Sequence, residues 1–106
     1  MLIVTTDRIE GHRVVQYLGI VSGDAIVGAN LFRDLFARVR DVVGGRAGGY
    51  EQALRGAKSH AIEDMIEEAQ RLGADAVLAV DLDYETVGES MLMVSANGTA
   101  VKLAKS

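Results

Sequence analysis

Cysteine and proline are both absent from this chain of 106 residues, and aromatic side chains make up only 5% of it. Without cysteine the chain cannot form a disulfide framework, a cysteine-ligated zinc or iron–sulfur centre, or a thiol nucleophile. The same absence fits a reducing compartment, so we expect a cytoplasmic protein. Hydrophobic residues make up 49% of the chain, and few of them are aromatic. The core must therefore be built mainly from Val, Ile, Leu, Ala and Met, which suit tightly packed layers of sheet and helix.

Charge and hydropathy exclude further classes of function. The formal net charge of −4 argues against a general affinity for nucleic acid or for acidic membrane surfaces. Neither a basic, hydrophobic leader nor an apolar run of membrane length is present, so we expect neither export nor membrane spanning. With two histidines and no nucleophile-elbow pattern, hydrolytic catalysis through an activated nucleophile is poorly supported.

Four segments have the composition of strands, rich in β-branched and other apolar residues. The longest of them contains Gly19 and Gly23, which predict bulges or a bend. Gly88 to Ser90 predicts the turn of a hairpin, and Asn97-Gly98 predicts a bulge inside one long final strand. The predicted strands cover residues 2–6, 13–28, 76–85 and 91–103.

Two segments in the middle of the chain have apolar residues at helical spacing. The first covers 31–43 and follows Asn30, a good N-cap, and the second covers 50–72 and ends before Gly73. The element order β-β-α-α-β-β describes one domain over the whole chain. We therefore expect an α+β fold of two layers, with an antiparallel sheet of about four strands packed with two helices.

The alternation of residues in the strands predicts assembly. A strand with one wet face should alternate apolar and polar side chains, but the long second strand is apolar on both faces. One face carries Val14, Leu18, Ile20 and Ile26, and the other carries Val15, Tyr17, Val21 and Val27. Two helices leave part of such a sheet uncovered, and large exposed apolar patches mark interfaces. We predict a homo-oligomer; the alternative is a monomer with one helix on each face.

The glycine-dense loop between the two predicted helices is a candidate ligand site. Gly44, Gly45 and Arg46 precede a helix start at Tyr50 and Glu51. Free N–H groups at a helix N-terminus attract anions, and Arg46 could clamp a phosphate or carboxylate. The spacing is not that of a Walker loop. The alternative is a tight turn in which Arg46 pairs with Glu51 or with an acidic residue of a neighbouring subunit.

A second candidate is a metal site on the long helix. His60, Glu63, Asp64 and Glu67 share one helix face and could coordinate a hard or borderline divalent cation. One helix seldom supplies more than two ligands without help from another element, so the alternative is a solvated acidic face.

Further carboxylates leave two more interpretations open. Asp81, Asp83 and Glu85 alternate along a predicted strand, where they could bind an ion or keep a strand end soluble. An enzyme could use Asp34 or Glu51 as a general base if a pocket raised the pKa of that carboxyl. The residues favour a binding or scaffold module over an enzyme.

Five segments occur in a characteristic order: 17–23, 28–34, 43–46 together with 50–51, 72–77 and 98–101. Together they resemble the YbjQ-like family, and the resemblance covers nearly the whole chain. It implies a dodecin-like subunit, with an antiparallel sheet against helix, that assembles with copies of itself as a homopentameric ring. The family also carries a heavy-metal-binding label. This sequence has no thiol to hold a soft heavy metal, and neither a cofactor nor an ion or small-molecule ligand is identified by the residues.

Overall fold

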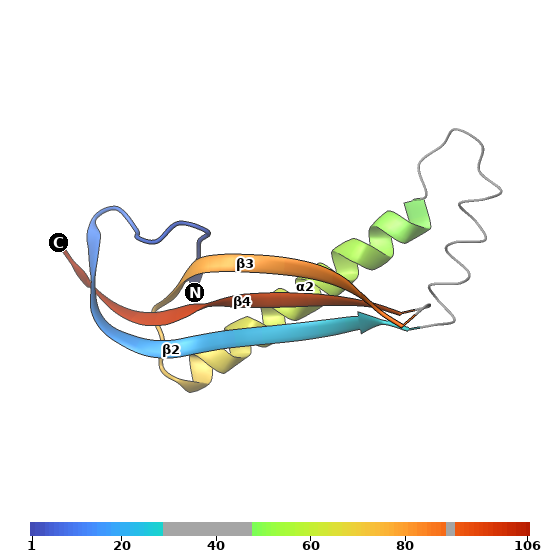
Figure 1. Cartoon of the computed structure of the whole chain (residues 1–106). Helices are drawn as coiled ribbons and strands as arrows, with labels where there is room; N and C mark the ends of the chain where they lie inside the picture. Colours follow the sequence, from blue (N-terminus) through green and yellow to red (C-terminus); the bar gives the residue numbers. More distant parts are fainter. Residues whose placement is uncertain (29–47, 89–90) are drawn as a thin grey trace.

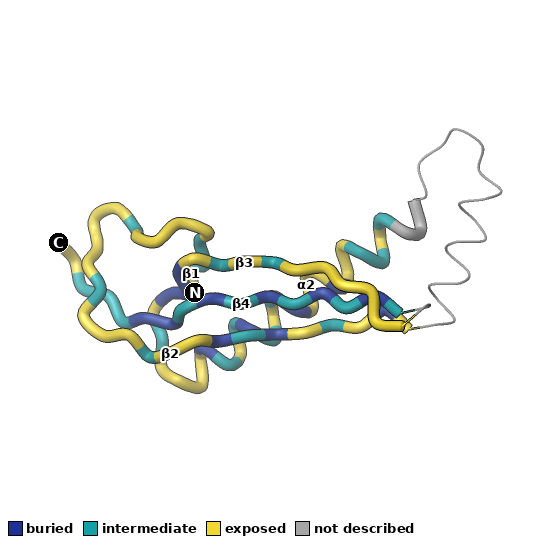
Figure 2. Tube along the Cα trace, in the orientation of Figure 1, coloured by how far each residue is buried: buried dark blue, intermediate teal, exposed yellow. Residues whose placement is uncertain are grey.

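The computed structural model describes residues 1–28, 48–88 and 91–106, with the backbone alone for residues 48–50. The elements in chain order are β1 (Leu2–Ile3), β2 (His12–Val27), α2 (Gly48–Arg71), β3 (Ala76–Val87) and β4 (Met91–Lys105); Figure 1 labels all of them except β1, which Figure 2 labels. The helix predicted over 31–43 and its cap at Asn30 lie outside the described residues. The fold is therefore α+β as predicted, with one helix observed in the described part of the chain.

The four strands form one mixed sheet in the order β1-β3-β4-β2. β4 lies between β3 and β2 and pairs antiparallel with both, which confirms the predicted hairpin of β3 and β4. β1 instead runs parallel to β3, with Leu2 opposite Ala76 and Ile3 opposite Val77. The prediction of an antiparallel sheet is wrong at this edge, because a strand of two residues has too little face pattern to indicate its direction and the intervening helix permits a parallel return.

Helix α2 covers one face of the sheet and supplies its side of the core (Figures 1 and 2). Its buried side chains recur every four residues: Ala57, Ala61, Met65 and Ala69. They pack in one cluster with inward-facing residues of β2 and β4 such as Val21 and Val94. Leu72, the last residue of the helix predicted over 50–72, is 44% exposed. Gly73 ends the helix with a φ of 77°, as predicted, so Leu72 lies where the chain already turns away from the sheet.

At Gly23 the backbones of β2 and α2 approach each other too closely for any side chain. A Cβ atom at this position would overlap the backbone oxygen of Ala61 and lie 2.5 Å from the backbone nitrogen of Met65. Gly19 has a different role, because its φ is 121° and the register shifts between Tyr17 and Gly19. The predicted bulge is thus confirmed at Gly19, whereas Gly23 is required by a close approach of two backbones.

A bulge interrupts β3 where Ala79 and Val80 together oppose Gly98 of β4. Ala79 adopts a φ of 54°, which is rare for a residue with a side chain. Its backbone nitrogen donates a hydrogen bond of 2.8 Å to the oxygen of Thr6. A Cβ at Gly98 would lie 2.5 Å from Val77 Cγ1, so glycine is needed opposite the bulge. The bulge expected in the final strand lies instead in β3, and β4 is continuous.

The face of the sheet away from α2 is covered at one end by the N-terminal segment. There Ala76, Leu78 and Val101 are buried beneath Val4 and Ile9 in a second, smaller cluster. Beyond this cluster, no described element covers the face (Figure 2). We call this uncovered area the open face.

The close approach of the two backbones at Gly23 predicts how a substitution there changes the free energy of unfolding. Gly23→Ala is expected to lower the free energy of unfolding by about 1–3 kcal/mol, because α2 must move away from β2 to admit a methyl group. The control is Gly56→Ala, in the interior of α2 with open space around its Cα. It should raise stability by up to about 1 kcal/mol through helix propensity. Urea unfolding at one fixed protein concentration measures both; a Gly23→Ala variant as stable as the parent would disprove the close contact.

Candidate functional site

Large apolar side chains of β2 lie on the open face. Ile20, Tyr17 and Ile26 are 79%, 72% and 61% exposed. The adjacent Val21 and Val27 point to α2 and are almost fully buried, which is the alternation of a strand. We call Tyr17, Ile20 and Ile26 the β2 patch. The prediction that both faces of β2 are apolar is confirmed, and one of these faces has no cover beyond the N-terminal segment in the described residues. The assignment of Tyr17 and Leu18 to the two faces is wrong, because the bulge at Gly19 exchanges them: Tyr17 lies opposite Val101 on the open face, and Leu18 packs in the cluster against α2.

Four carboxylates also belong to the open face. The bulge in β3 shifts the alternation by one residue, so that Asp81, Asp83 and Glu85 point away from α2. Asp24 of β2 is opposite Ser95 of β4, and Asp83 is opposite the same serine from the other side. The negative charge of Asp81 raises the pKa of Asp83 above its ordinary value, and desolvation and Glu85 act in the same direction. The predicted row of carboxylates is therefore present, and its members repel one another.

The carboxylates on α2 divide between solvent and the edge of the sheet. His60, Glu63 and Glu67 are exposed. Asp64 turns toward β2, where its Oδ2 accepts a hydrogen bond of 3.4 Å from the backbone nitrogen of Asp24. One turn later, Glu68 Oε2 accepts a bond of 3.2 Å from the nitrogen of Ser22. Sequence reasoning missed this contact between helix carboxylates and strand amides, because nothing in the spacing on α2 shows which strand lies beside it.

The described residues of one chain do not form a metal centre. Within residues 1–28, 48–88 and 91–106, no three His, Asp or Glu side chains are grouped so that they could hold a metal ion. The predicted ligands His60, Glu63, Asp64 and Glu67 lie along α2, and a second element brings no further ligand to them in this part of the chain.

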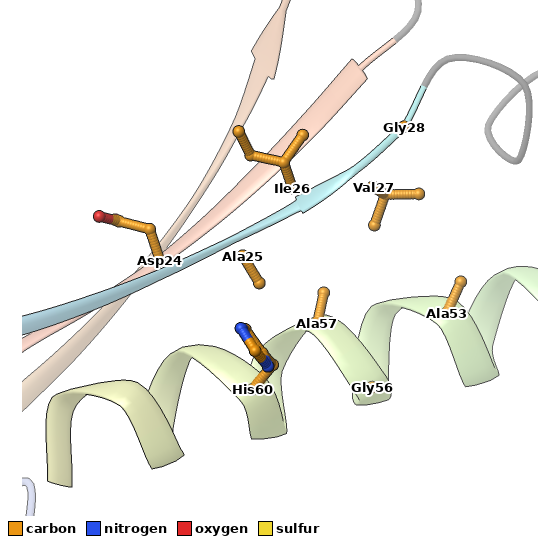
Figure 3. Close-up of a pocket in the computed structure, with 9 residues that line it drawn as sticks. All are labelled: Asp24, Ala25, Ile26, Val27, Gly28, Ala53, Gly56, Ala57 and His60. Atoms are coloured by element: carbon orange, nitrogen blue, oxygen red, sulfur yellow. The ribbon is translucent and has the colours of Figure 1, made fainter. Parts of the chain in front are cut away.

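A groove of about 590 Å³ lies between the end of β2 and the first half of α2 (Figure 3). Ala25 and Val27 point into it from the strand, and Ala57 points into it from the helix. The imidazole of His60 stands at one end, whereas the carboxylate of Asp24 points away from the helix. The lining is mostly apolar, so the groove suits an apolar group with one polar contact at His60.

The predicted anion site falls largely outside the described residues. Gly44, Gly45 and Arg46 are among residues 29–47, as is Asp34, and Tyr50 is described by its backbone alone. Glu51 is half-buried in the first turn of α2, where a negative charge is favourable next to the positive end of the helix dipole. The site with Arg46 stays a prediction.

These features define a small α+β protein: a mixed four-stranded sheet with a helix on one face and an open, partly acidic surface on the other. The chain belongs to the YbjQ family, whose family model matches residues 1–104. The family is described as "putative heavy-metal-binding". A solved structure of similar fold is a protein of unknown function of the DUF74 family from Pediococcus pentosaceus. It is 16% identical, covers 98% of each chain and gives a TM-score of 0.61, which shows the fold alone. Among the described residues, no helix has both the length and the hydropathy to cross a lipid bilayer.

The repulsion at Asp83 predicts a dependence of stability on pH. A carboxyl whose pKa is raised on folding binds its proton more tightly in the folded state, so its ionisation costs stability as the pH rises above 3.8. Asp83→Asn should therefore raise the melting temperature at pH 7, and the gain should shrink as the pH falls toward about 3. Thermal melts of both proteins across this range measure it. Glu63→Gln, which removes one exposed charge from α2, is the control; an equal gain there would show a net-charge effect only.

Proposed function

We propose that the chain is a subunit of a homo-oligomeric ring that serves as a binding and scaffold module for an ion or small ligand. The observation that supports the ring is the β2 patch, in which Tyr17, Ile20 and Ile26 are mostly exposed on an uncovered sheet face. Burial of apolar surface stabilises by about 25 cal/mol per Å², so three such side chains favour association. The resemblance supplies a pentamer of dodecin-like subunits, and the lack of cysteine supports a cytoplasmic setting.

The shape of the described part of the chain supports the same proposal. Over these residues the principal extents are 55 × 25 × 16 Å, and the Cα radius of gyration is 17.1 Å. A compact domain of this length has a radius of gyration of about 13 Å. A long, thin subunit has a large surface for its core, and association with further copies would reduce the exposed part of that surface.

Light scattering after size-exclusion chromatography tests the ring. The mass should be a multiple of the 11.3 kDa of one chain, and five times this mass for the pentamer. Ile20→Asp should dissociate the oligomer, because the contact would then have to bury an unpaired carboxylate, at a cost of several kcal/mol. Leu72→Asp is the matched control, since Leu72 is also an exposed apolar residue but lies at the end of α2. A parent protein of 11.3 kDa at micromolar concentrations contradicts the proposal.

Binding of a divalent metal between subunits is a second candidate function. The specific observation is the gathering of Asp24, Asp81, Asp83 and Glu85 on the open face, together with the description of the family. Carboxylates suit hard or borderline cations such as Mn²⁺ more than soft ones. Because one chain forms no metal-ligand group in its described residues, such a site would combine carboxylates of more than one copy.

Calorimetric titration of protein purified without an affinity tag tests the metal candidate. Mn²⁺ should bind to the parent oligomer and to His60→Gln, whereas Asp83→Asn should bind at least about 10-fold more weakly through loss of a charged ligand. The Ile20→Asp variant keeps all four carboxylates, so its loss of binding would place the site between subunits. Absence of heat at micromolar Mn²⁺ and Zn²⁺ removes the candidate.

A further inference from the structure

A second apolar surface lies on the other face of the sheet, beside α2. Val80 and Leu82 of β3 face the helix and are only partly buried, and by strand alternation Tyr84, 49% exposed, follows them on the same side. Ile66 is half-buried on the flank of α2 opposite to Asp64. We call Leu82, Tyr84 and Ile66 the β3 patch.

This patch is uncovered because α2 lies closer to β2 than to β3. The helix packs extensively on β2 and far less on β3. The absence of a side chain at Gly23 brings the helix backbone onto β2, and Asp64 and Glu68 bond to amides of the same strand. The helix-facing side of β3 is left without an equivalent partner in the described residues.

We propose that the β2 patch of one copy packs on the β3 patch of the next, so that neighbouring subunits overlap face to face. We call this head-to-tail packing the tile arrangement. The two patches occupy opposite faces of the sheet and opposite sides of β4. A two-fold contact needs the same surface on both copies, whereas a contact between two different surfaces is head-to-tail and closes into a ring if the rotation permits. This inference rests on the proposed homo-oligomer and specifies how its copies meet.

The charges favour this contact over a two-fold pairing of β2 patches. Asp24 lies between Ile20 and Ile26 in the β2 patch, so a pairing of two such patches would bring like charges together. The flank of α2 that carries Ile66 also carries exposed Lys58, by helical spacing, on the side that borders the β3 patch. A head-to-tail contact therefore brings an acidic surface near a basic residue.

The edge of β2 argues for contact through side chains on the faces. Strand addition needs free amides along an edge, and the outward amides of Ser22 and Asp24 already donate to Glu68 and Asp64. A neighbouring strand at this position would have to displace two carboxylates and part of α2. The exposed β2 patch remains accessible without any such rearrangement.

A mixing experiment tests the tile arrangement. Ile20→Asp removes the β2 patch and Tyr84→Asp removes the β3 patch, and each variant alone should fall to the 11.3 kDa mass of one chain. In an equimolar mixture, the intact β3 patch of the first fits the intact β2 patch of the second. Native mass spectrometry should then show a 1:1 dimer of twice 11.3 kDa and no larger ring. Separately tagged variants of slightly different mass make this dimer unambiguous.

Three controls make the outcome decisive. Circular dichroism confirms that both variants are folded, and Ile20→Thr with Tyr84→Thr replaces the pair if either aspartate variant is not. Leu72→Asp should keep the parent mass. An oligomer that survives Tyr84→Asp, or a mixture that stays monomeric, overturns the tile arrangement. A parent protein that is itself monomeric overturns the homo-oligomer, and this is a different result.

Discussion

The contact between the backbones of β2 and α2 at Gly23 determines the layout of this protein. Because Gly23 has no side chain, the backbone of α2 packs directly on β2. The carboxylates of Asp64 and Glu68 then reach the backbone amides at the outer edge of this strand. A helix held there covers β2 and β4 well and β3 poorly. The same contact thus makes the core and leaves the β3 patch exposed on the helix side, whereas the β2 patch is exposed because no described element covers most of the open face. The association that we propose depends on where the helix is held as much as on overall hydrophobicity.

The bulge at Ala79 and Val80 determines the chemistry of these surfaces. One extra residue exchanges the faces of every later side chain in β3. Without it, Asp81 would point at α2 and Tyr84 would point to the open face. With it, the carboxylates are solvated and Tyr84 lies on the helix side. The bulge is held by hydrogen bonds that the amides of Ala79 and Val80 donate to the carbonyl oxygens of Thr6 and Val4, so the first residues of the chain influence a surface formed near its end.

Residue patterns in the sequence predict the elements better than their contacts. The long strands, α2 and its end at Gly73 follow from composition, spacing and capping. The parallel direction of β1, the reason for Gly23 and the contact of Asp64 with β2 depend on which segments become neighbours, and local spacing carries no such information. Met93 illustrates the same limit. Both Leu92 and Met93 are apolar, and only their pairing with β2 shows that Leu92 is buried against α2 while Met93 is half-buried on the open face.

The exposed surfaces also limit how copies of the chain can meet. A flat sheet with bare edges and two apolar faces would add strands without limit. Here the amides of Ser22 and Asp24 are bonded to the helix, and the row from Asp81 to Glu85 places repelling charges beside the open edge of β3. Backbone pairing is therefore disfavoured at both sides of the sheet. The apolar side chains of the β2 and β3 patches remain accessible on the two faces of the sheet, and this arrangement favours the closed assembly that we propose over an aggregate.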